Sequence, residues 1–529
     1  MGQSGNKASL NDMKTDFDVV IAGGGVNGAG IARDLAGRGF HVLLCERDDL
    51  ASHTSSSSTK LIHGGLRYLE HFEFSLVRKA LIEREILMKS APHIIWPMRF
   101  VMPYDRSMRP AWMIRLGIFL YDHLAKREIL PSSNSVNFAN HESGAPLQSH
   151  FKLGFEYSDA WVDDARLVIL NAIDAQQKGA TILTRTACTS AVRKNQSWEV
   201  SIQNDDGESK KIHARLFVNA TGPWAESFLK TTHISSNALK EKNLRLIKGS
   251  HIVIPRIFDH TFSYIFQNAD KRITFAIPYE NTYTLIGTTD VEFQGDPKDV
   301  HASSEEIAYL CKQVNHYFKK TITPADVVRH YSGVRPLLED EAADASATTR
   351  DYELQLTKDH EAPLLTVWGG KITTYRVLAE EASNLISSTL QPSAKPWTAS
   401  SYLPGGDLRS YLEYPNRPDL DFSIFLDKVK QAYPWIPTQL MLRWARAYGS
   451  RIPLLIKTAT CLSDLGQEIA PLLFEAELHY LINEEWAKSA EDILWRRTKL
   501  GLHFSKNEIQ QVNDWMNHQV KSSEGLACN

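Results

Sequence analysis

A glycine-rich motif near the N-terminus is the first set of residues whose spacing points to a chemistry. Gly23, Gly25 and Gly28 form the pattern Gly-x-Gly-x-x-Gly. The motif follows the apolar run Val19–Ile21, typical of a buried strand, and opens a helix-like stretch that ends near Gly37. In such motifs the first glycine allows a tight turn, the second lets a pyrophosphate approach the backbone, and the third permits close packing of helix and strand. The strand-to-helix context therefore predicts a dinucleotide site.

A carboxylate follows at the end of the next apolar stretch. The run FHVLLCE ends on Glu46, about 20 residues after the motif, where a carboxylate can accept hydrogen bonds from the ribose hydroxyls of adenosine. The same carboxylate would repel a 2′-phosphate, which argues against NADP. The two strands and the helix between them form one β-α-β unit and imply a parallel sheet. The alternative is a glycine-rich turn that binds no ligand.

Composition excludes several other classes of protein. The 529 residues are 43% hydrophobic and 23% charged, with a net charge of −3. These values are typical of a soluble globular protein of about three to four structural units and not of a disordered chain or a coiled coil. A nucleic-acid-binding protein would show a basic excess. Five scattered cysteines predict neither a disulfide framework nor a metal site.

Membrane-spanning segments are not expected. Residues 1–16 are polar, so they do not form a signal peptide, and no apolar run reaches the roughly 18 residues that cross a bilayer. The longest candidate, AWMIRLGIFL at 111–120, is interrupted by Arg115. Residues 106–127 combine bulky apolar side chains with cations, which is what a helix lying on anionic lipid requires. An ordinary core helix is the alternative.

The chain as a whole alternates between recognisable units. Helices are expected from about Phe74 to Ser90 and from Asp163 to Gly179, and residues 240–335 are rich in strand patterns. Residues 387–407 are rich in Pro, Gly and Ser and predict a linker. Beyond this linker the pattern is helical and contains several tryptophans.

Several sequence blocks together resemble one enzyme family. They run in order from about residue 17 to 376 and include GGGVNGAGIARDLAGRG, TSSSSTKLIHGGLRYLEHFEF, FEYSDAWVDDARL, VNATGPWA, RLIKGSHIVIP, IGTTDVEFQGDP, YSGVRPL and GGKITTYR, with LWRRTKLG in the helical tail. This set is similar to FAD-dependent glycerol-3-phosphate dehydrogenases. The resemblance implies FAD as cofactor, oxidation of sn-glycerol 3-phosphate to dihydroxyacetone phosphate, and transfer of the electrons to a membrane quinone, either ubiquinone or menaquinone.

The resemblance also implies an architecture. We expect an α/β fold, with a Rossmann-like FAD-binding domain of the glutathione-reductase and D-amino-acid-oxidase type, a β-rich substrate-binding cap and a C-terminal all-α domain. The expected ranges are 17–95, 155–235 and 336–386 for the FAD-binding domain, 96–154 and 236–335 for the cap, 387–407 for the linker and 408–529 for the helical domain.

Cationic side chains in these blocks suit a phosphate monoester, because Arg offers bidentate donors to phosphate oxygens. By similarity to the family, Arg67, Tyr68, Arg350 and Lys371 would bind the phosphate, and Arg335 would lie near the reacting C2 hydroxyl. Each cation forms an ordinary ion pair in the alternative interpretation.

Oxidation of an alcohol also requires a base for the hydroxyl proton, and histidine has a suitable pKa. We favour His251 as this base, because the family places it over the flavin; His63 would instead pack along the flavin. Both histidines could be structural. The catalytic residues expected are therefore His251, Arg335 and Lys371.

The remaining expectations concern the cofactor. Three strand-end or loop segments would contact FAD, and a helix opened by Gly370, Lys371 and Thr373 would present its N-terminal amides to the reduced flavin. The full set of predicted cofactor contacts is Gly23, Gly25, Asn27, Gly28, Glu46, Ser55, Ser58, Lys60, His63, Gly64, Gly65, Thr221, Gly222, Gly370 and Thr373.

Alternatives and partners complete the sequence interpretation. A glycerol-3-phosphate oxidase that uses O2, an amino-acid-oxidase-like flavoenzyme and a silent flavin-binding scaffold remain as alternatives. The absence of an EF-hand pattern and of a transit-peptide-like start favours a bacterial protein, cytoplasmic and peripheral on the inner face of the cell membrane. A homodimer is compatible with the sequence, and no nucleic-acid partner is expected.

Overall fold

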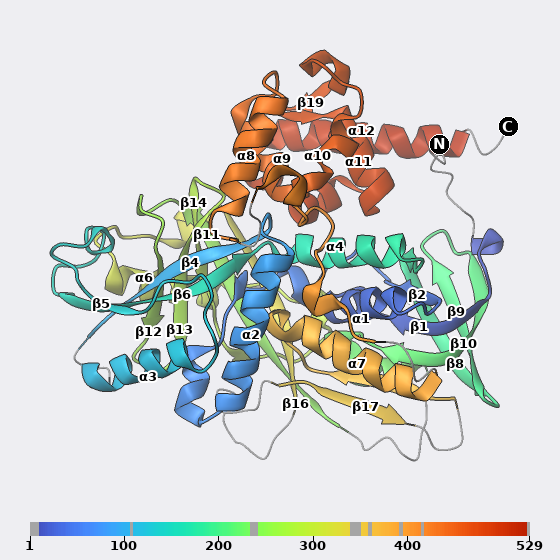
Figure 1. Ribbon diagram of the computed structural model, residues 1–529, viewed down its shortest axis with the longest axis horizontal. Coiled ribbons are helices and arrows are strands. Elements are labelled where there is room, and N and C mark those ends of the chain that lie inside the picture. Colours follow the sequence, from blue (N-terminus) through green and yellow to red (C-terminus); the bar gives the residue numbers. More distant parts are fainter. Residues whose placement is uncertain are drawn as a thin grey trace.

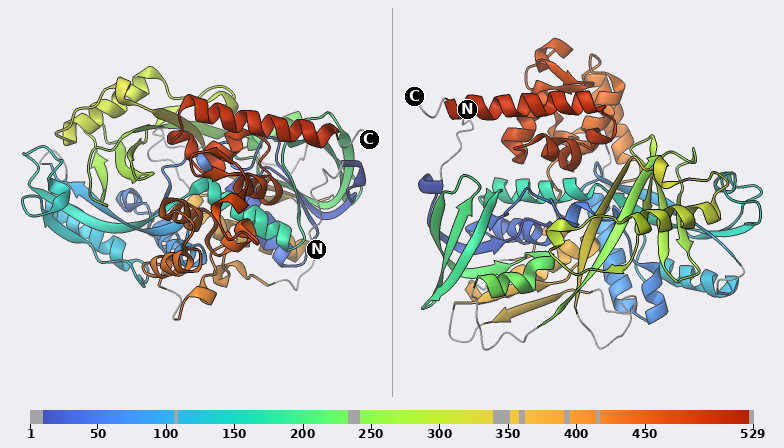
Figure 2. Two further views of the ribbon diagram at one scale, coloured as in Figure 1. Left: turned by 90° about the horizontal axis from the view of Figure 1, so that it is seen from above. Right: turned by 180° about the vertical axis from the view of Figure 1, so that it is seen from behind.

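The computed structural model describes residues 10–105, 109–232, 242–338, 351–357, 362–390, 395–413 and 417–525. Two large β-sheets form the body of the molecule, and a mainly helical unit made by the last quarter of the chain packs on top of them (Figure 1). Figure 2 shows the same helical unit from two further directions, with its long last helix on the outside. The expected α/β class is confirmed.

The first sheet has the order β17-β18-β10-β1-β2-β7, in which β1 runs parallel to β2 and β10. Val19, Val20 and Ile21 of β1 are fully buried, as expected for a central strand covered on both faces. Helices α1, α4 and α7 pack against this sheet and one another. The bounds are β1 (Asp16–Ala22), β2 (Val42–Cys45), β7 (Thr181–Leu183), β8 (Thr186–Lys194), β9 (Ser197–Asn204), β10 (Ser209–Asn219), β17 (Glu353–Thr357), β18 (Leu364–Trp368), α1 (Val26–Gly37), α4 (Asp164–Gln177), α5 (Ala225–Thr231) and α7 (Tyr375–Leu390).

The second sheet has the order β15-β11-β14-β13-β12-β4-β6-β3, with β16 on β11 and β5 on β6. The predicted boundary at residue 155 does not coincide with a change of sheet, because the whole of β6 belongs to this second sheet. Its elements are β3 (Leu61–Ile62), β4 (Ile95–Pro103), β5 (Asn134–Asn137), β6 (Leu153–Val162), β11 (Leu244–Pro255), β12 (Ser263–Gln267), β13 (Ile273–Tyr279), β14 (Tyr283–Gly287), β15 (Val291–Glu292) and β16 (Arg329–Leu338), with α2 (Phe74–Ser90), α3 (Ala111–His123) and α6 (Ser304–Tyr317) beside them.

The C-terminal unit is helical apart from one small hairpin. Its core is formed by α8 (Asp421–Ala432), α9 (Thr438–Tyr448), α10 (Ile452–Ile456), α11 (Glu475–Glu485) and α12 (Lys506–Gly525), with β19 (Glu468–Ala470) and β20 (Leu473–Phe474) as the hairpin. Buried ion pairs fix it to α4 and to the loop after β2: Arg166 of α4 binds Glu485, and Arg497 binds Asp49, with Nη2 and Oδ1 2.8 Å apart. The expected helical tail is confirmed.

Two glycines bring α1 directly against the end of β1. A Cβ atom at Gly28 would lie 1.9 Å from the carbonyl oxygen of Gly23, and a Cβ at Gly23 would lie 2.5 Å from the carbonyl oxygen of Ala220. Gly23 also adopts φ +107°, a conformation that side chains disfavour. The backbone therefore turns tightly enough to place the first turn of α1 over the carboxyl edge of the sheet.

The outer helices follow their local signals closely. α2 covers the predicted range, and the Asp163 side chain caps α4 by accepting a hydrogen bond from the Arg166 N–H at 3.2 Å. Among the described helices, none is both long and apolar enough to cross a membrane.

Candidate active site

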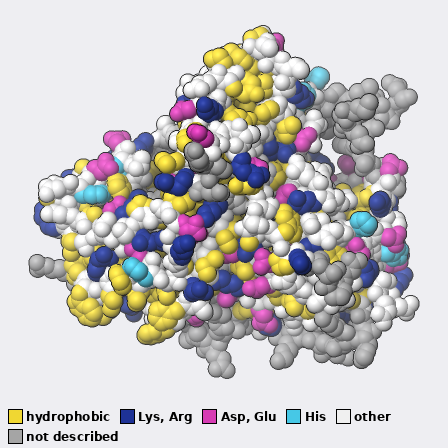
Figure 3. Space-filling view, in the orientation of Figure 1, with side chains coloured by type: hydrophobic (Ala, Val, Ile, Leu, Met, Phe, Trp, Pro, Cys, Tyr) yellow, Lys and Arg dark blue, Asp and Glu magenta, His cyan; other side chains and the backbone are white. Residues whose placement is uncertain are grey.

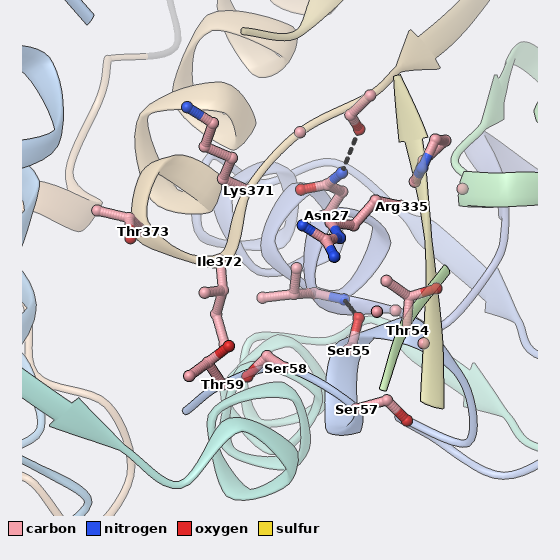
Figure 4. Close-up of a pocket in the computed structure, with 18 of the residues that line it drawn as sticks. Asn27, Thr54, Ser55, Ser57, Ser58, Thr59, Arg335, Lys371, Ile372 and Thr373 are labelled. Carbon is pink, nitrogen blue, oxygen red and sulfur yellow. Dashed lines mark hydrogen bonds between the residues drawn. The ribbon is translucent and has the colours of Figure 1, made fainter. Parts of the chain in front are cut away.

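A cavity of about 600 Å³ lies where the carboxyl ends of β1, β2, β10 and β18 face the second sheet. Its walls come from the first turn of α1, the loop at 51–59, the segment 63–70, the 369–373 turn and side chains of β11 and β16. Figure 4 shows Asn27, the 54–59 loop, Arg335 and residues 371–373 around it. Ligands of open α/β sheets bind at this edge, so the fold itself places the cavity at a binding position.

Most of the predicted site residues line this one cavity. They are Gly23, Gly25, Asn27, Glu46, Ser55, Ser58, His63, Gly64, Gly65, Arg67, Tyr68, Thr221, Gly222, His251, Arg335, Gly370, Lys371 and Thr373. Two predicted residues do not line it. Gly28 lies behind the Gly23 turn, in keeping with its predicted packing role, and Lys60 points elsewhere. Arg350 lies outside the described residues.

The first turn of α1 faces the cavity with its N–H groups. The N-cap residue, Gly25, has no side chain with which to cap this helix end, and no acidic residue lies in the first turn. Ser55 Oγ accepts a hydrogen bond from the Val26 N–H at 3.0 Å, and Asn27 Nδ2 donates to the Gly369 carbonyl at 3.2 Å. The Oδ1 atom of Asn27 is buried and has no hydrogen-bond partner within the described chain. The positive end of a helix suits an anionic diphosphate, whereas the Asn27 oxygen can accept a hydrogen bond from a ligand hydroxyl.

Glu46 is held rigidly at the neighbouring strand end. Its Oε2 accepts from the Gly24 N–H at 2.6 Å and its Oε1 from the Asp48 N–H at 2.9 Å. Burial raises the pKa of this carboxyl, and the two backbone N–H groups oppose that rise. Each carboxylate oxygen has a second lone pair, so Glu46 can still accept from a ribose hydroxyl.

The loop at 54–60 is fastened from behind by a buried ion pair. Lys60 Nζ lies 2.7 Å from Asp164 Oδ1, and both residues are almost completely buried. Asp164 Oδ2 also accepts from Ser58 Oγ at 2.8 Å. The prediction of a cofactor contact at Lys60 therefore does not match its placement: the ammonium group holds the loop and does not reach the cavity.

His251 lies against this loop from the opposite sheet. Its Nε2 is 2.9 Å from Thr59 Oγ1, and its ring stacks on Tyr331 with centroids 4.9 Å apart. The residue is 2% exposed, and its Nδ1 has no hydrogen-bond partner in the part of the chain that the structure describes. Burial lowers the pKa of His251 well below its ordinary value, and the positive charges of Arg335 and Lys60 lower it further. The imidazole is therefore neutral and able to accept a proton.

Arg335 reaches the cavity from β16 and is oriented by two acceptors. Its Nη1 lies 2.9 Å from Asp290 Oδ1, and its Nη2 donates to the Thr289 carbonyl at 2.8 Å. Lys371 approaches from the 369–373 turn, with Nζ 4.0 Å from the ring centroid of Tyr68. Arg67 lies half-buried on the same segment as Tyr68. Cations from two sheets thus face one cavity.

Several side chains that support the site carried no chemical signal in the sequence. Tyr121 of α3 accepts from the Gly64 N–H at 2.7 Å and donates to Asp159, whose carboxylate also binds Arg84. Tyr121, Thr59 and Asp290 are ordinary residue types whose role depends on partners far away in the chain. Asp159 and Asp290 do lie within the sequence blocks YSDAW and IGTTD, which was the available hint.

Comparisons with known proteins identify the family. Residues 18–376 match the model of FAD dependent oxidoreductases, and residues 398–525 match the C-terminal domain of alpha-glycerophosphate oxidase. A glycerol-3-phosphate dehydrogenase from Pseudomonas aeruginosa is 48% identical to this chain. The match covers 94% of this chain and 95% of the Pseudomonas protein. The chain belongs to the FAD-dependent oxidoreductases, in the glycerol-3-phosphate dehydrogenase family. FAD is its cofactor.

Two further members of the family refine this result. The D-erythritol 1-phosphate dehydrogenase of Brucella abortus is 47% identical, covering 95% of this chain and 98% of its own. The solved structure of a Bacillus halodurans glycerol-3-phosphate dehydrogenase with FAD has a TM-score of 0.72 at 24% identity, covering 96% of this chain and 95% of that one. The family therefore includes relatives named for two different polyol phosphates.

The residues that line the cavity fit FAD. The glycine turn and the positive N-terminal end of α1 suit the diphosphate, and Glu46 suits the ribose. Tyr121 and Leu81 leave no room for a Cβ at Gly64, which would lie 2.7 Å from the tyrosine hydroxyl oxygen. The segment that follows β3 is thus held as bare backbone beside the cavity, where a flat ring system can approach it.

The Lys60–Asp164 pair gives a prediction on stability. In Lys60→Met the buried Asp164 carboxylate loses its counter-charge, which typically costs about 3–5 kcal/mol. We expect a lower urea midpoint and an earlier release of flavin fluorescence on heating. Lys194→Met is the matched control, because Lys194 pairs with Glu199 on the surface and should change stability by about 1 kcal/mol or less. Equal effects of the two substitutions would contradict the assignment.

His251 gives a prediction on pH dependence. Since its pKa lies well below 6.5, the base stays neutral through the physiological range, and kcat/KM for flavin reduction should have no acid limb near pH 6.5. The limb should lie at lower pH. The unfolded chain binds this proton at a higher pH than the folded chain does, so His251 also lowers stability as the pH falls below about 6.5. An acid limb near 6.5 that disappears in His251→Asn would refute this prediction.

Proposed function

We propose that the chain oxidises sn-glycerol 3-phosphate to dihydroxyacetone phosphate and passes the electrons to a membrane quinone. One observation carries the proposal: a buried neutral imidazole, His251, lies in the same cavity as the cations Arg335, Lys371 and Arg67. A phosphate monoester of a polyol has both features that such a site recognises, an anionic end and a hydroxyl that must lose a proton. An amino acid would require a carboxylate site and would not need as many cations.

In this reaction the residues have distinct roles in phosphate binding, orientation of the hydroxyl and proton abstraction. Arg67, Tyr68 and Lys371 bind the phosphate, and Arg335 donates to the oxygen of the reacting hydroxyl. His251 accepts the hydroxyl proton, for which its depressed pKa keeps it in the required neutral form. The bound FAD supplies the two-electron acceptor for the hydride. The turn at 369–373 opens α7, so its N–H groups stabilise negative charge that develops beside it.

The substrate is tested by anaerobic bleaching of the purified holoenzyme. We expect sn-glycerol 3-phosphate to bleach the flavin, with a kcat/KM at least about tenfold above that of D-erythritol 1-phosphate, because one additional hydroxymethyl group must fit the same cavity. Glycerol without phosphate should leave the flavin oxidised. A preference for D-erythritol 1-phosphate would refute sn-glycerol 3-phosphate as the substrate and identify the four-carbon compound instead. Bleaching by neither compound would refute the proposed function.

The acceptor is tested with the same enzyme. After reduction by the substrate, a short-chain ubiquinone or menaquinone analogue should reoxidise the flavin much faster than air-saturated buffer does. Rapid reoxidation by O2 with stoichiometric H2O2 would instead favour the oxidase.

Helix α3 is the surface that we assign to the membrane. Its inner face buries Ile114, Ile118 and Tyr121, whereas Trp112 is 65% exposed. Figure 3 shows apolar side chains gathered over this helix, at the lower left of the view. The exposed apolar residues here are Trp112, Met113, Leu116, Phe119 and Leu120, with Phe72 and Phe74 on the adjoining segment. Arg109 and Lys126 flank the helix, whereas Arg106 lies outside the described residues.

This assignment predicts a separation of lipid binding from catalysis. The double variant Trp112→Ser/Phe119→Ser changes only exposed side chains, so it should fold, retain FAD and reduce a soluble dye normally. It should no longer co-sediment with vesicles of anionic phospholipid, because the apolar area that enters the headgroups is lost. Ile424→Ser/Leu454→Ser, on the C-terminal unit, removes similarly exposed apolar side chains and should leave co-sedimentation unchanged. Loss of FAD in the first variant, or of vesicle binding in the second, would contradict the assignment.

A further inference from the structure

A buried carboxylate outside the cavity connects several residues of the second sheet. Glu306 lies in the first turn of α6 and is 6% exposed. It does not line the cavity. A buried carboxylate is costly unless its oxygens are satisfied, so its partners show what the charge organises.

Four donors surround the Glu306 carboxylate. Oε1 accepts from Ser250 Oγ at 2.8 Å and from Thr289 Oγ1 at 2.7 Å. Oε2 lies 2.6 Å from Lys248 Nζ and accepts from the Ser303 N–H at 3.0 Å. These partners hold the pKa of Glu306 below its usual value although burial opposes this. The group is therefore an anion that joins α6 to β11 and to the turn after β14.

The two oxygens serve different elements. Oε2 completes the capping box of α6 with Ser303, which is a local helix-stabilising interaction. Oε1 has no part in that cap. It binds Ser250 and Thr289, and the Ser250 N–H also donates to Thr289 Oγ1 at 2.9 Å. The residues next along the chain are His251 and Asp290, both of which line the cavity.

The connection continues to the substrate side. The carbonyl oxygen of Thr289 accepts from Arg335 Nη2, and Asp290 pairs with Nη1 of the same guanidinium. There is little free space around this group, because a Cβ at Gly249 would lie 2.3 Å from Arg335 Nη2. Rotation of Thr289 would therefore move one of the two acceptors that orient Arg335.

We propose that Glu306 is a positioning residue, which fixes Thr289 and Asp290 and through them the guanidinium of Arg335 at the reacting oxygen. The proposal rests on the function assigned to Arg335 above. Glu306 itself does not touch substrate or flavin. Its oxygens set the geometry of a turn on which the orientation of the catalytic cation depends, and a helix cap alone would have no effect on that orientation.

The first test measures kinetics of the holoenzyme. Glu306→Gln keeps the shape but loses the charge that binds Lys248 and replaces one acceptor by a donor. We expect flavin bleaching at saturating sn-glycerol 3-phosphate to slow by roughly tenfold to a hundredfold, with KM changed by less than about threefold, since a displaced Arg335 would bind the reacting oxygen less well. Glu306→Asp should restore part of the rate.

Two variants locate the effect. Thr289→Val removes the hydroxyl that binds Oε1 but keeps the carbonyl that binds Arg335, and it should reproduce the slow bleaching. The double variant should be little worse than either single one, because both break the same connection. Glu305→Gln is the control, since Glu305 is the exposed neighbour on α6 and should leave bleaching unchanged.

The second test does not depend on the substrate. Phenylglyoxal modifies guanidinium groups, and peptide mapping by mass spectrometry measures the modification of Arg335 specifically. An Arg335 released from its acceptors should react several-fold faster in Glu306→Gln than in the wild type or in Glu305→Gln. Unchanged labelling and unchanged bleaching, with only a lower melting temperature, would overturn the positioning role. Glu306 would then act only as the N-terminal cap of α6. Faster labelling in an enzyme that no polyol phosphate bleaches would sustain the positioning role and refute the proposed function alone.

Discussion

The buried ion pair between Lys60 and Asp164 is the interaction on which the site depends most. It fastens the 54–60 loop to the first turn of α4, and the outer side of this loop contacts the second sheet through Thr59 and His251. The Tyr331 hydroxyl adds a hydrogen bond to the Ser58 carbonyl at 3.0 Å. Both sheets therefore use one loop as their common wall. An isolated buried pair would be costly, but the hydrogen bonds from Ser58 to Asp164 offset part of the desolvation.

Charge is distributed unevenly around the cavity, and the distribution explains how one site can hold an anion and a neutral base. Arg335 and Lys371 present positive charge to it, while the carboxylates Asp290 and Asp159 lie at its wall as partners of Arg335 and Arg84. Burial lowers the pKa of His251, and the positive charges of Arg335 and Lys60 lower it further, so the imidazole remains uncharged. A protonated imidazole there would add a cation but lose the lone pair that proton abstraction requires. The positive charges that would bind the phosphate in the proposed reaction therefore add to the effect of burial in keeping the proposed base neutral.

The sequence was most informative where structure depends on neighbouring residues. The glycine turn, the bounds of α2 and the start of α4 each follow from a few adjacent residues, and each is predicted from the sequence. Lys60 is a residue whose placement could not be predicted from its neighbours in sequence. It lies between Ser58 and His63, both of which line the cavity, but its backbone adopts φ +61° and directs the side chain to Asp164, which is far away in sequence. Tyr121 and Glu306 are similar cases. Their roles depend on which strand or loop the fold places against them. Residue type and spacing do not predict these tertiary contacts.

The two faces of helix α3 have different surroundings: one is exposed on the surface, and the other packs beside the Gly64 segment. Its outer face carries the exposed Trp112 and Phe119, whereas its inner face supplies Tyr121 to the Gly64 N–H and to Asp159. A helix has 3.6 residues per turn, so residues 112 and 119 share a face, and residue 121 lies on the opposite face. The proposed lipid contact and the support of the Gly64 segment therefore depend on different side chains of the same helix. A substitution on the outer face can remove the first without disturbing the second, but any change that moves the helix as a whole must also move the hydrogen bond that holds Gly64.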